Sequence, residues 1–228
     1  MGIPVIIGNI ATSLDGKIAP FDRSRTKISV DEDFLLRDLI RSESDGILIG
    51  GRTLLYDQPS LTIKNSDLIS KRVNEGKEPQ PAGICLCGNQ LPLSDNHFFE
   101  VKGNRKIIIC PDEAAVNYPG CEIIHSGKGR PDIRTAMEKL YDCGIKKLMV
   151  EGGGTIMFEF LRLKLMREFY ISIHPIIIGG SGAPTCFDGD GFNAEEIVGL
   201  NVIKTRILSD GGIIYHCTTD NYKPQFNY

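Results

Sequence analysis

The chain has 228 residues, 41% of them hydrophobic, and carries a formal net charge of -3 at pH 7. This length fits one large domain or two small ones, and the hydrophobic content is sufficient for a sizeable core. A slightly acidic chain presents no global basic field, so we expect no nucleic-acid partner. The purely apolar runs are too short for a membrane span, and the N-terminal stretch lacks a signal-peptide pattern, so we expect a soluble, cytoplasmic protein.

Strand-like and helix-like segments alternate from the N-terminus onward. Residues 3–10 form an apolar run rich in β-branched side chains, which predicts a strand buried on both faces. Ser29 and Glu32 match a capping box in front of a predicted helix with four apolar side chains on one face. These side chains are Leu35, Leu36, Leu39 and Ile40. Short strands are predicted at residues 46–50, 84–87 and 105–110. The polar stretch 65–81 is predicted to be an exposed loop.

The same alternation continues to the C-terminus. Helices are predicted at residues 131–141 and 155–165, and strands at residues 145–150 and 169–178. The turn Ser209-Asp210-Gly211-Gly212 joins two further strands and is typical of a β-hairpin. The pattern as a whole predicts an α/β fold with a mostly parallel sheet and a C-terminal antiparallel hairpin. We expect a single domain over residues 1–228.

The seven cysteines and four histidines do not have the spacing of a metal site. The number of cysteines is odd, their spacing is irregular, and no Cys-x-x-Cys motif occurs. We therefore interpret the cysteines as small buried hydrophobic side chains and expect no bound metal.

The strongest candidate for a ligand site is the turn Glu151-Gly152-Gly153-Gly154-Thr155, between a predicted strand and a predicted helix. Glycines let the backbone approach a ligand closely, and the start of a helix offers N–H groups and the positive end of its dipole to an anion. Thr155 can add a hydroxyl donor or cap the helix. The alternative is a tight connection between strand and helix without a ligand. It matches neither the dinucleotide-binding fingerprint nor the Walker A loop.

Two further turns carry candidate residues. Thr53 lies in a turn after the second predicted strand, and Asp57 follows shortly after it. Ligands of open α/β sheets bind at the carboxyl ends of parallel strands, so both residues are candidates, although local capping explains them equally well. Lys17 ends the turn that follows the first strand, where it could meet an anionic substrate or lie in solvent.

Taken in order, these segments resemble the reductase family of riboflavin biosynthesis. This family includes the C-terminal domain of the bifunctional bacterial deaminase-reductase and the stand-alone archaeal and fungal diaminopyrimidine reductases. The matching stretches are residues 9–19, 26–29, 49–62, 150–155 and 175–180, which span nearly the whole chain. The family is similar in fold to dihydrofolate reductase, which implies a three-layer α/β/α arrangement. Its members use NADPH to reduce the ribosylamino group of a pyrimidinone 5′-phosphate to a ribitylamino group, with hydride going to C1′ of the sugar.

The resemblance also implies roles for individual residues and a homodimer. The residues implied to bind NADPH are Thr53, Asp57, Gly152, Gly153, Gly154 and Thr155. The residues implied to bind the phosphorylated pyrimidine substrate are Asn9, Thr26, Arg41, Leu61, Lys64 and Glu151. Lys17, Asp57 and Glu151 are the candidate catalytic residues, and Lys17 and Asn9 would lie near the reacting sugar. Arg41 and Lys64 suit a substrate phosphate.

Three positions depart from the family pattern. Lys64 stands where bacterial domains carry arginine, and Gln58 replaces the second aspartate of an Asp-Asp-Pro motif. The stretch 85–88 lacks the Asp-Ser pair that is usual near the 2′-phosphate of the cofactor, so NADH is an alternative cofactor. A stand-alone reductase implies the diamino substrate rather than the deaminated uracil. Alternatives are a reductase of the deaminated substrate, a pterin or imine reductase of the same fold, and a nucleotide-binding sensor.

Overall fold

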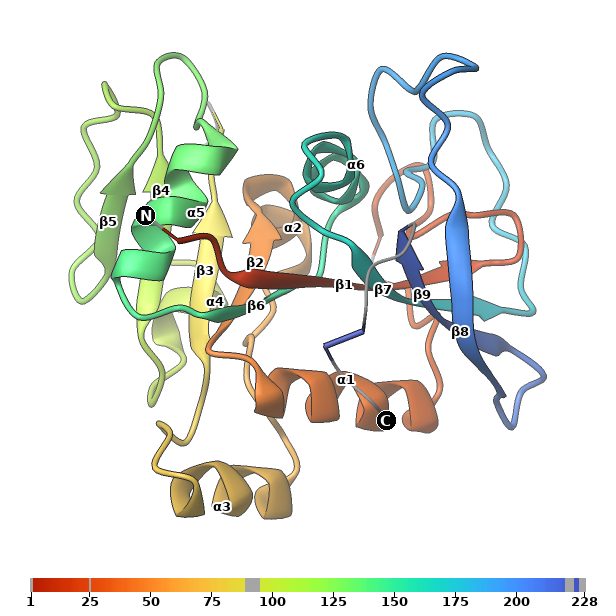
Figure 1. Cartoon of the computed structure of the whole chain (residues 1–228), viewed down its shortest axis with the longest axis horizontal. Coiled ribbons are helices and arrows are strands. Elements are labelled where there is room, and N and C mark those ends of the chain that lie inside the picture. The colour runs from red at the N-terminus through yellow and green to blue at the C-terminus, as the bar shows by residue number, and fades with distance from the viewer. Residues whose placement is uncertain (1, 25, 89–94, 220–223, 226–228) are drawn as a thin grey trace. The chain divides into compact units, whose positions relative to one another are not determined.

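The computed structural model describes residues 2–24, 26–88, 95–219 and 224–225. Figure 1 follows the chain from its N-terminus to its C-terminus, and the contacts divide it into two compact units. The first unit comprises Met1–Val5 and Leu35–Met149, and the second comprises Ile6–Phe34 and Val150–Tyr228. The single domain expected over residues 1–228 stays a prediction.

Parallel strands form the frame of the first unit. They are β2 (Gly46–Gly50), β3 (Ala82–Leu86), β4 (Lys106–Cys110), β5 (Glu122–His125) and β6 (Lys147–Val150). They lie in the order β5-β4-β3-β2-β6, and the pairs β2/β3, β3/β4 and β4/β5 are parallel. β2, β3 and β4 are buried along their whole length, as expected for apolar strands covered on both faces.

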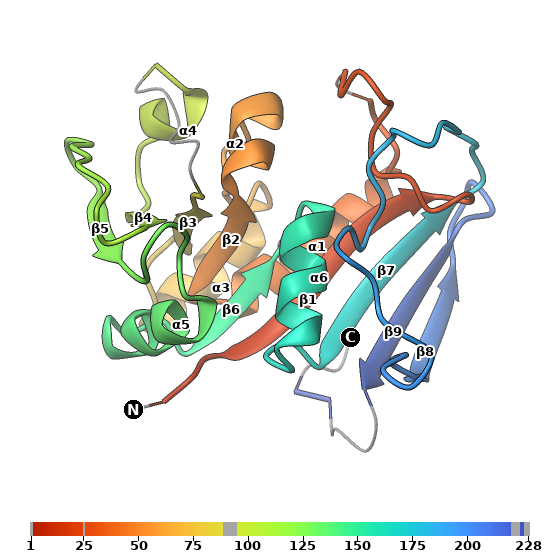
Figure 2. The ribbon, with the colours of Figure 1, turned by 90° about the horizontal axis from the view of Figure 1, so that it is seen from above.

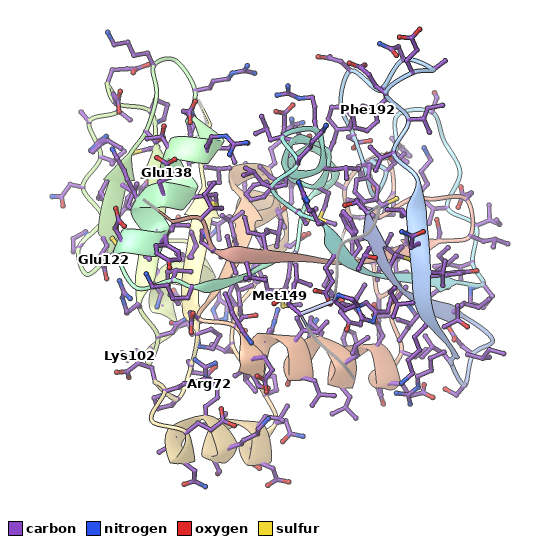
Figure 3. The ribbon with its side chains drawn as sticks, in the orientation of Figure 1. Arg72, Lys102, Glu122, Glu138, Met149 and Phe192 are labelled. Atoms are coloured by element: carbon purple, nitrogen blue, oxygen red, sulfur yellow. The ribbon has the colours of Figure 1, made fainter. Side chains whose placement is uncertain are left out.

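Helices connect the strands of the first unit. They are α2 (Gly51–Asp57), α3 (Ser66–Asn74), α4 (His97–Glu100) and α5 (Ile133–Asp142). α3 is anchored by Arg72, whose side chain is labelled in Figure 3. Its buried guanidinium donates hydrogen bonds to the carbonyl oxygens of Ser42, Ser44 and Glu78. These three bonds satisfy a charged group that would otherwise be costly to bury.

The second unit combines a parallel strand pair with an antiparallel hairpin. Its strands are β1 (Val5–Ser13), β7 (Glu168–His174), β8 (Leu200–Ile207) and β9 (Ile213–Thr219). They lie in the order β1-β7-β9-β8; β1 and β7 are parallel, and the β7/β9 and β8/β9 pairs are antiparallel. Figure 2 shows these strands side by side, with α6 (Gly154–Arg162) lying against β1.

The two faces of β1 and β7 differ in character. On one face, Gly8 lies under α6, because a Cβ at that position would meet the sulfur of Met166 and the methyl group of Met157. On the other face, the register pairs Asn9 with Tyr170, and Ser172 donates a 2.5 Å hydrogen bond to Asp33 of α1 (Asp31–Glu43). The second unit therefore has an apolar face under α6 and a polar buried face toward the start of α1.

The α/β fold with a mostly parallel sheet and a C-terminal hairpin is confirmed. Every predicted strand and helix occurs; β2 has the predicted ends, and the ends of the others are shifted. The structure adds β5 and the helices α2, α3 and α4. α3 lies inside the stretch 65–81 that was expected to be a loop, and Asn65 caps it by accepting hydrogen bonds from the backbone of Asp67 and Leu68. β7 ends at His174 rather than at residue 178, because Pro175 has no N–H to continue the ladder.

The predicted start of the first helix is wrong. α1 begins at Asp31, and the Glu32 carboxylate accepts hydrogen bonds from the backbone and hydroxyl of Ser209 instead of closing a capping box with Ser29. The predicted apolar face is also wrong at Leu35, which is 47% exposed. Within the described part of the chain, no helix has both the length and the apolar character that a membrane crossing requires.

Candidate functional site

The glycine turn at the start of α6 has the geometry expected of an anion site. Gly152 has a φ of 101° and is joined to Gly153 by a cis peptide bond. Gly153 is the N-cap residue, so the cap has no side chain to accept from the first N–H groups of α6. Thr155, the second residue of the helix, is exposed and is not the cap that one interpretation of the sequence expected. The first turn of α6 can therefore offer its N–H groups to an anion.

Gly154 is required for a reason that the sequence did not reveal. A Cβ at this position would lie 2.1 Å from the carbonyl oxygen of Thr185 and 3.1 Å from both the nitrogen and Oδ2 of Asp188. A contact of that kind with backbone leaves no room for any side chain. The missing side chain of the third glycine thus makes room for a segment of the protein itself, and the expected contact of its backbone with a ligand stays a prediction.

Lys17 lies in a tightly bonded turn after β1. Its backbone N–H donates to the hydroxyl of Ser13, and its ammonium donates a 3.1 Å hydrogen bond to the carbonyl oxygen of Ala183. Lys17 is half-buried, so it does not simply lie in solvent. An ammonium has three N–H donors, and one bond to Ala183 leaves donors for a ligand.

Asp15 anchors the same turn to the chain beyond β7. Its carboxylate accepts hydrogen bonds from the hydroxyl of Ser13 at 2.6 Å and from the backbone N–H groups of Ile178 and Gly179. The Ser13 bond, followed by those to the backbone, lowers the pKa of Asp15 from 3.8 to about 2. The carboxylate is therefore charged at neutral pH and fixes the turn that carries Lys17.

Asp15→Asn is expected to weaken the fold only where Asp15 is charged. Because the pKa of this carboxyl is depressed in the folded state, its contribution is complete above about pH 4 and is lost as pH falls through about 2. In a series of thermal unfolding curves, the gap between wild type and Asp15→Asn should be constant above about pH 4 and close toward pH 2. A gap that persists unchanged at pH 2 would contradict this role.

Asn9 presents a buried polar group to the interior of the second unit. Its side chain is on the polar face of β1 and only 8% exposed, and its Oδ1 has no hydrogen-bond partner among the residues that the structure describes. Leaving such an oxygen unsatisfied costs on the order of 1–3 kcal/mol. A ligand with a hydroxyl or amino group would remove that cost, which agrees with the expected substrate contact.

Other expected residues of the second unit are more accessible. Thr26 is exposed, and its hydroxyl donates to the carbonyl oxygen of Ser24. Glu151 is half-buried and directly precedes the glycine turn. Their expected contacts with substrate stay predictions.

In the first unit, α2 places two of the expected residues. Gly50 is the N-cap of this helix, Thr53 lies in its first turn, and Asp57 is its last residue and is exposed. Gln58 follows with a left-handed φ of 44°, and its side-chain oxygen accepts a hydrogen bond from the backbone of His97. Gln58 therefore ends the helix and joins it to α4.

Leu61 and Lys64 belong to a segment that α1 holds in place. Leu61 has a φ of 48° and is 1% exposed, so its side chain packs in the core and only its backbone can meet a ligand. Arg41 of α1 is 4% exposed and donates a 2.6 Å hydrogen bond to the carbonyl oxygen of Thr62. Asp38 of α1 accepts from the backbone of Lys64. Arg41 thus positions this segment, while the side chain of Lys64 is exposed.

A buried cluster around His174 was missed by the sequence analysis. His174 is fully buried; its Nδ1 lies 2.9 Å from Oδ2 of Asp210, and its Nε2 lies 3.8 Å from Oδ2 of Asp33. Asp33 also accepts the hydrogen bond from Ser172. A second pair, His216 and Glu168, is 2.8 Å apart. The partners are far apart in sequence, and no spacing rule would have found them.

The interpretation of the cysteines as buried hydrophobic residues is confirmed for four of them and is wrong for one. Cys85, Cys87, Cys110 and Cys217 are buried, whereas Cys143, which follows α5, is exposed. Burial raises the pKa of Cys110 and Cys217, which keeps these thiols protonated.

Comparison with known proteins decides the family. The model of the RibD C-terminal domain matches residues 4–214. This chain belongs to the RibD C-terminal domain family. A family relative from Archaeoglobus fulgidus, named 2,5-diamino-6-ribosylamino-4(3H)-pyrimidinone 5′-phosphate reductase, is 35% identical over 83% of this chain and 88% of its own length. A reductase of the same name from Methanothermobacter thermautotrophicus is 31% identical over 92% of this chain and 96% of its own length. The resemblance inferred from the sequence motifs is confirmed.

Solved structures of the family confirm the fold. A pyrimidine reductase-like protein from Corynebacterium diphtheriae superposes with a TM-score of 0.79 at 17% identity, covering 96% of this chain and 93% of its own. A deaminase/reductase from Thermotoga maritima superposes with a TM-score of 0.76 at 22% identity. This chain spans 57% of the Thermotoga protein and is itself covered to 96%. The dihydrofolate-reductase-like α/β class expected for the family is therefore confirmed.

Proposed function

We propose that this protein reduces the ribosylamino side chain of 2,5-diamino-6-ribosylamino-4(3H)-pyrimidinone 5′-phosphate to the ribitylamino form with NADPH, in riboflavin biosynthesis. The observation that carries the proposal is the 35% identity to the Archaeoglobus reductase of that name over 88% of its length. The glycine N-cap at the start of α6 and the unsatisfied oxygen of Asn9 support it, because both are suited to a ligand with phosphate and hydroxyl groups.

The residues present fit a nicotinamide cofactor. The N–H groups at the start of α6, from Gly154 and Thr155, suit its diphosphate, and Gly152 and Gly153 bring the backbone of the turn to the ligand. Thr53 and Asp57 of α2 are proposed as further contacts. NADPH is the proposed form, and NADH remains the alternative because the stretch 85–88 lacks the usual Asp-Ser pair.

The substrate contacts are proposed from the family resemblance, and the exposure of the side chains divides their roles. Lys64 is the proposed partner of the substrate 5′-phosphate, because it is exposed whereas the guanidinium of Arg41 is buried against Thr62. Leu61 contributes backbone, since its side chain lies in the core. The remaining proposed contacts are Thr26, Glu151 and Asn9.

The chemistry requires one hydride and one proton. When bound, a nicotinamide cofactor would supply the hydride; C1′ of the ring-opened imine would accept it, and the imine nitrogen would take up a proton. Lys17 is proposed to lie near this sugar and to donate a hydrogen bond or the proton. Its ammonium is held in place by a 3.1 Å hydrogen bond to the carbonyl oxygen of Ala183. Glu151 and Asp57 are each proposed to accept hydrogen bonds from hydroxyl or amino groups, which is a positioning role.

Oxidation of NADPH by the purified protein tests the proposal. The diamino ribosylamino substrate, its deaminated uracil counterpart and dihydrofolate are compared at equal concentration, each also with NADH. We expect turnover with the diamino compound and NADPH, and little with dihydrofolate. Turnover of dihydrofolate alone would assign a pterin reductase, and binding of NADPH without any turnover would assign a sensor.

Lys64→Ala is expected to raise the KM for the substrate by about 10-fold or more, through loss of a charge-assisted phosphate contact. The dissociation constant of NADPH should change far less. Lys102→Ala, at a lysine labelled in Figure 3 that is exposed in the first unit, is the control and should leave both values unchanged. Equal losses of substrate and NADPH affinity in Lys64→Ala would argue against a substrate-phosphate role.

We also propose a homodimer, with β8 as its contact strand. All eight residues of β8 are exposed, which is unusual for a strand with apolar side chains. The apolar ones are Leu200, Val202, Ile203 and Ile207, with 40–76% exposure. Cytoplasmic location stays a prediction from the sequence.

A further inference from the structure

Residues 183–188, which we name the bridging segment, contact the Lys17 turn at one end. Lys17 and Thr185 form an antiparallel bridge, in which the backbone of Ile18 donates to Pro184 and that of Cys186 donates to Gly16. The ammonium of Lys17 donates to Ala183. The position of Lys17 therefore depends on where this segment lies.

The same segment contacts the start of α6 on its other side. The carbonyl oxygen of Thr185 would be 2.1 Å from a Cβ on Gly154, and the backbone nitrogen and Oδ2 of Asp188 would each be 3.1 Å from it. Beyond the segment, Gly189 lies so close to Phe158 of α6 that a Cβ there would be 2.1 Å from the ring. α6 and the segment are thus packed with backbone against backbone.

A short set of hydrogen bonds fixes the shape of the bridging segment. The Thr185 hydroxyl donates to Oδ1 of Asp188 at 2.5 Å, and the Thr185 backbone N–H donates to the same carboxylate at 3.1 and 3.2 Å. Both side chains are only half-exposed. Thr185 therefore contacts Lys17, Gly154 and Asp188 at the same time.

We infer that Thr185 and Asp188 are positioning residues for the reduction. They hold the turn that carries Lys17 in a fixed relation to the glycine turn at the start of α6, where the cofactor phosphates are proposed to bind. The inference rests on the proposed function. A displacement of about 1 Å between reacting groups can cost about 100-fold in rate, so a small change in this segment has a large effect on hydride transfer.

Thr185→Val tests this inference, because valine keeps the shape of threonine and removes only the hydroxyl bonds to Asp188 and Phe187. We expect kcat to fall about 10-fold or more, with a change in substrate KM of less than about threefold. With NADPH deuterated at the transferred position, the isotope effect on kcat should increase, since hydride transfer becomes the slow step. Thr185→Ser retains the hydroxyl and should restore kcat and the isotope effect to within about twofold of wild type.

Thr135→Val on α5 is the matched control and should behave as wild type. Asp188→Asn, which replaces one carboxylate oxygen that faces Thr185 with an amide nitrogen, should shift kcat and the isotope effect in the same direction and serves if Thr185→Val does not fold. An unchanged isotope effect and kcat in a folded Thr185→Val or Asp188→Asn protein would overturn the inference. Absence of turnover in the wild-type protein, measured in the same assay, would instead refute the proposed function.

Discussion

Gly154→Ala is expected to lower kcat/KM of the proposed reduction by about 100-fold and to weaken NADPH binding. The new Cβ would lie 2.1 Å from the carbonyl oxygen of Thr185, which is backbone and cannot rotate away. Either the start of α6 or the bridging segment must therefore move. Movement of the first displaces the N–H groups proposed to bind phosphate, and movement of the second displaces Lys17. A shift on the order of 1 Å is enough for a loss of this size.

The measurements are an NADPH titration and steady-state kinetics, with thermal unfolding to establish that the variant folds. Gly182→Ala is the matched control, because a Cβ at Gly182 meets nothing within 4 Å and the residue immediately precedes the bridging segment. It should leave NADPH affinity and kcat/KM unchanged. A folded Gly154→Ala protein with normal NADPH affinity and normal turnover would show that the packing at Gly154 is unrelated to the site.

Only part of the role of the glycine turn could be predicted from the sequence. A strand, three glycines and a helix predicted a helix start open to an anion, and the cap at Gly153 has that form. The sequence gives no sign that Gly154 serves a different purpose from its neighbours. That difference comes from Thr185 and Asp188, which reach α6 only through the tertiary fold. Local sequence patterns indicate which conformations the backbone can adopt. They do not indicate which distant segment of the chain will pack against it.

The prediction of which residues α1 buries was wrong for a related reason. Apolar periodicity selected Leu35 as an inward residue, whereas the buried positions of the helix include Asp38 and Arg41. These charged side chains are acceptable inside because they bond the backbone of Thr62 and Lys64. A helix that holds a neighbouring segment through buried polar bonds is misjudged by any rule that equates burial with hydrophobicity.

By contrast, β2 and β4 were predictable because they are buried along their whole length. β2 is a continuous apolar run and β4 is apolar after Lys106, and the pattern for such strands needs no knowledge of partners. The hairpin of β8 and β9 was predictable from its turn, Ser209 to Gly212, for the same reason. The order of strands in each unit was not, since it depends on contacts between distant segments.

His174→Ala is expected to lower the free energy of unfolding by about 3 kcal/mol, because it removes a fully buried side chain and leaves the carboxylate of Asp210 without its 2.9 Å partner. His174 joins the start of α1, the end of β7 and the β8–β9 turn, so its loss affects three elements at once. Urea unfolding at neutral pH measures the change. His97→Ala is the control: that histidine also faces a carboxylate, Glu100 at 3.4 Å, but its side chain is 54% exposed, so the cost should be below about 1 kcal/mol.

The pH dependence of the same variant identifies the partner responsible. The hydrogen bond from His174 is the main cause that lowers the pKa of Asp210. A carboxyl with a depressed pKa stabilises the fold above its ordinary pKa of 3.8, and this contribution disappears as pH falls through the folded value. The difference in stability between wild type and His174→Ala should therefore be largest near neutral pH and shrink below about pH 4. A loss that does not diminish in acid would mean that the cost arises from the cavity rather than from the lost contact with Asp210, and a loss of the same size in His97→Ala would mean that burial of the pair does not matter.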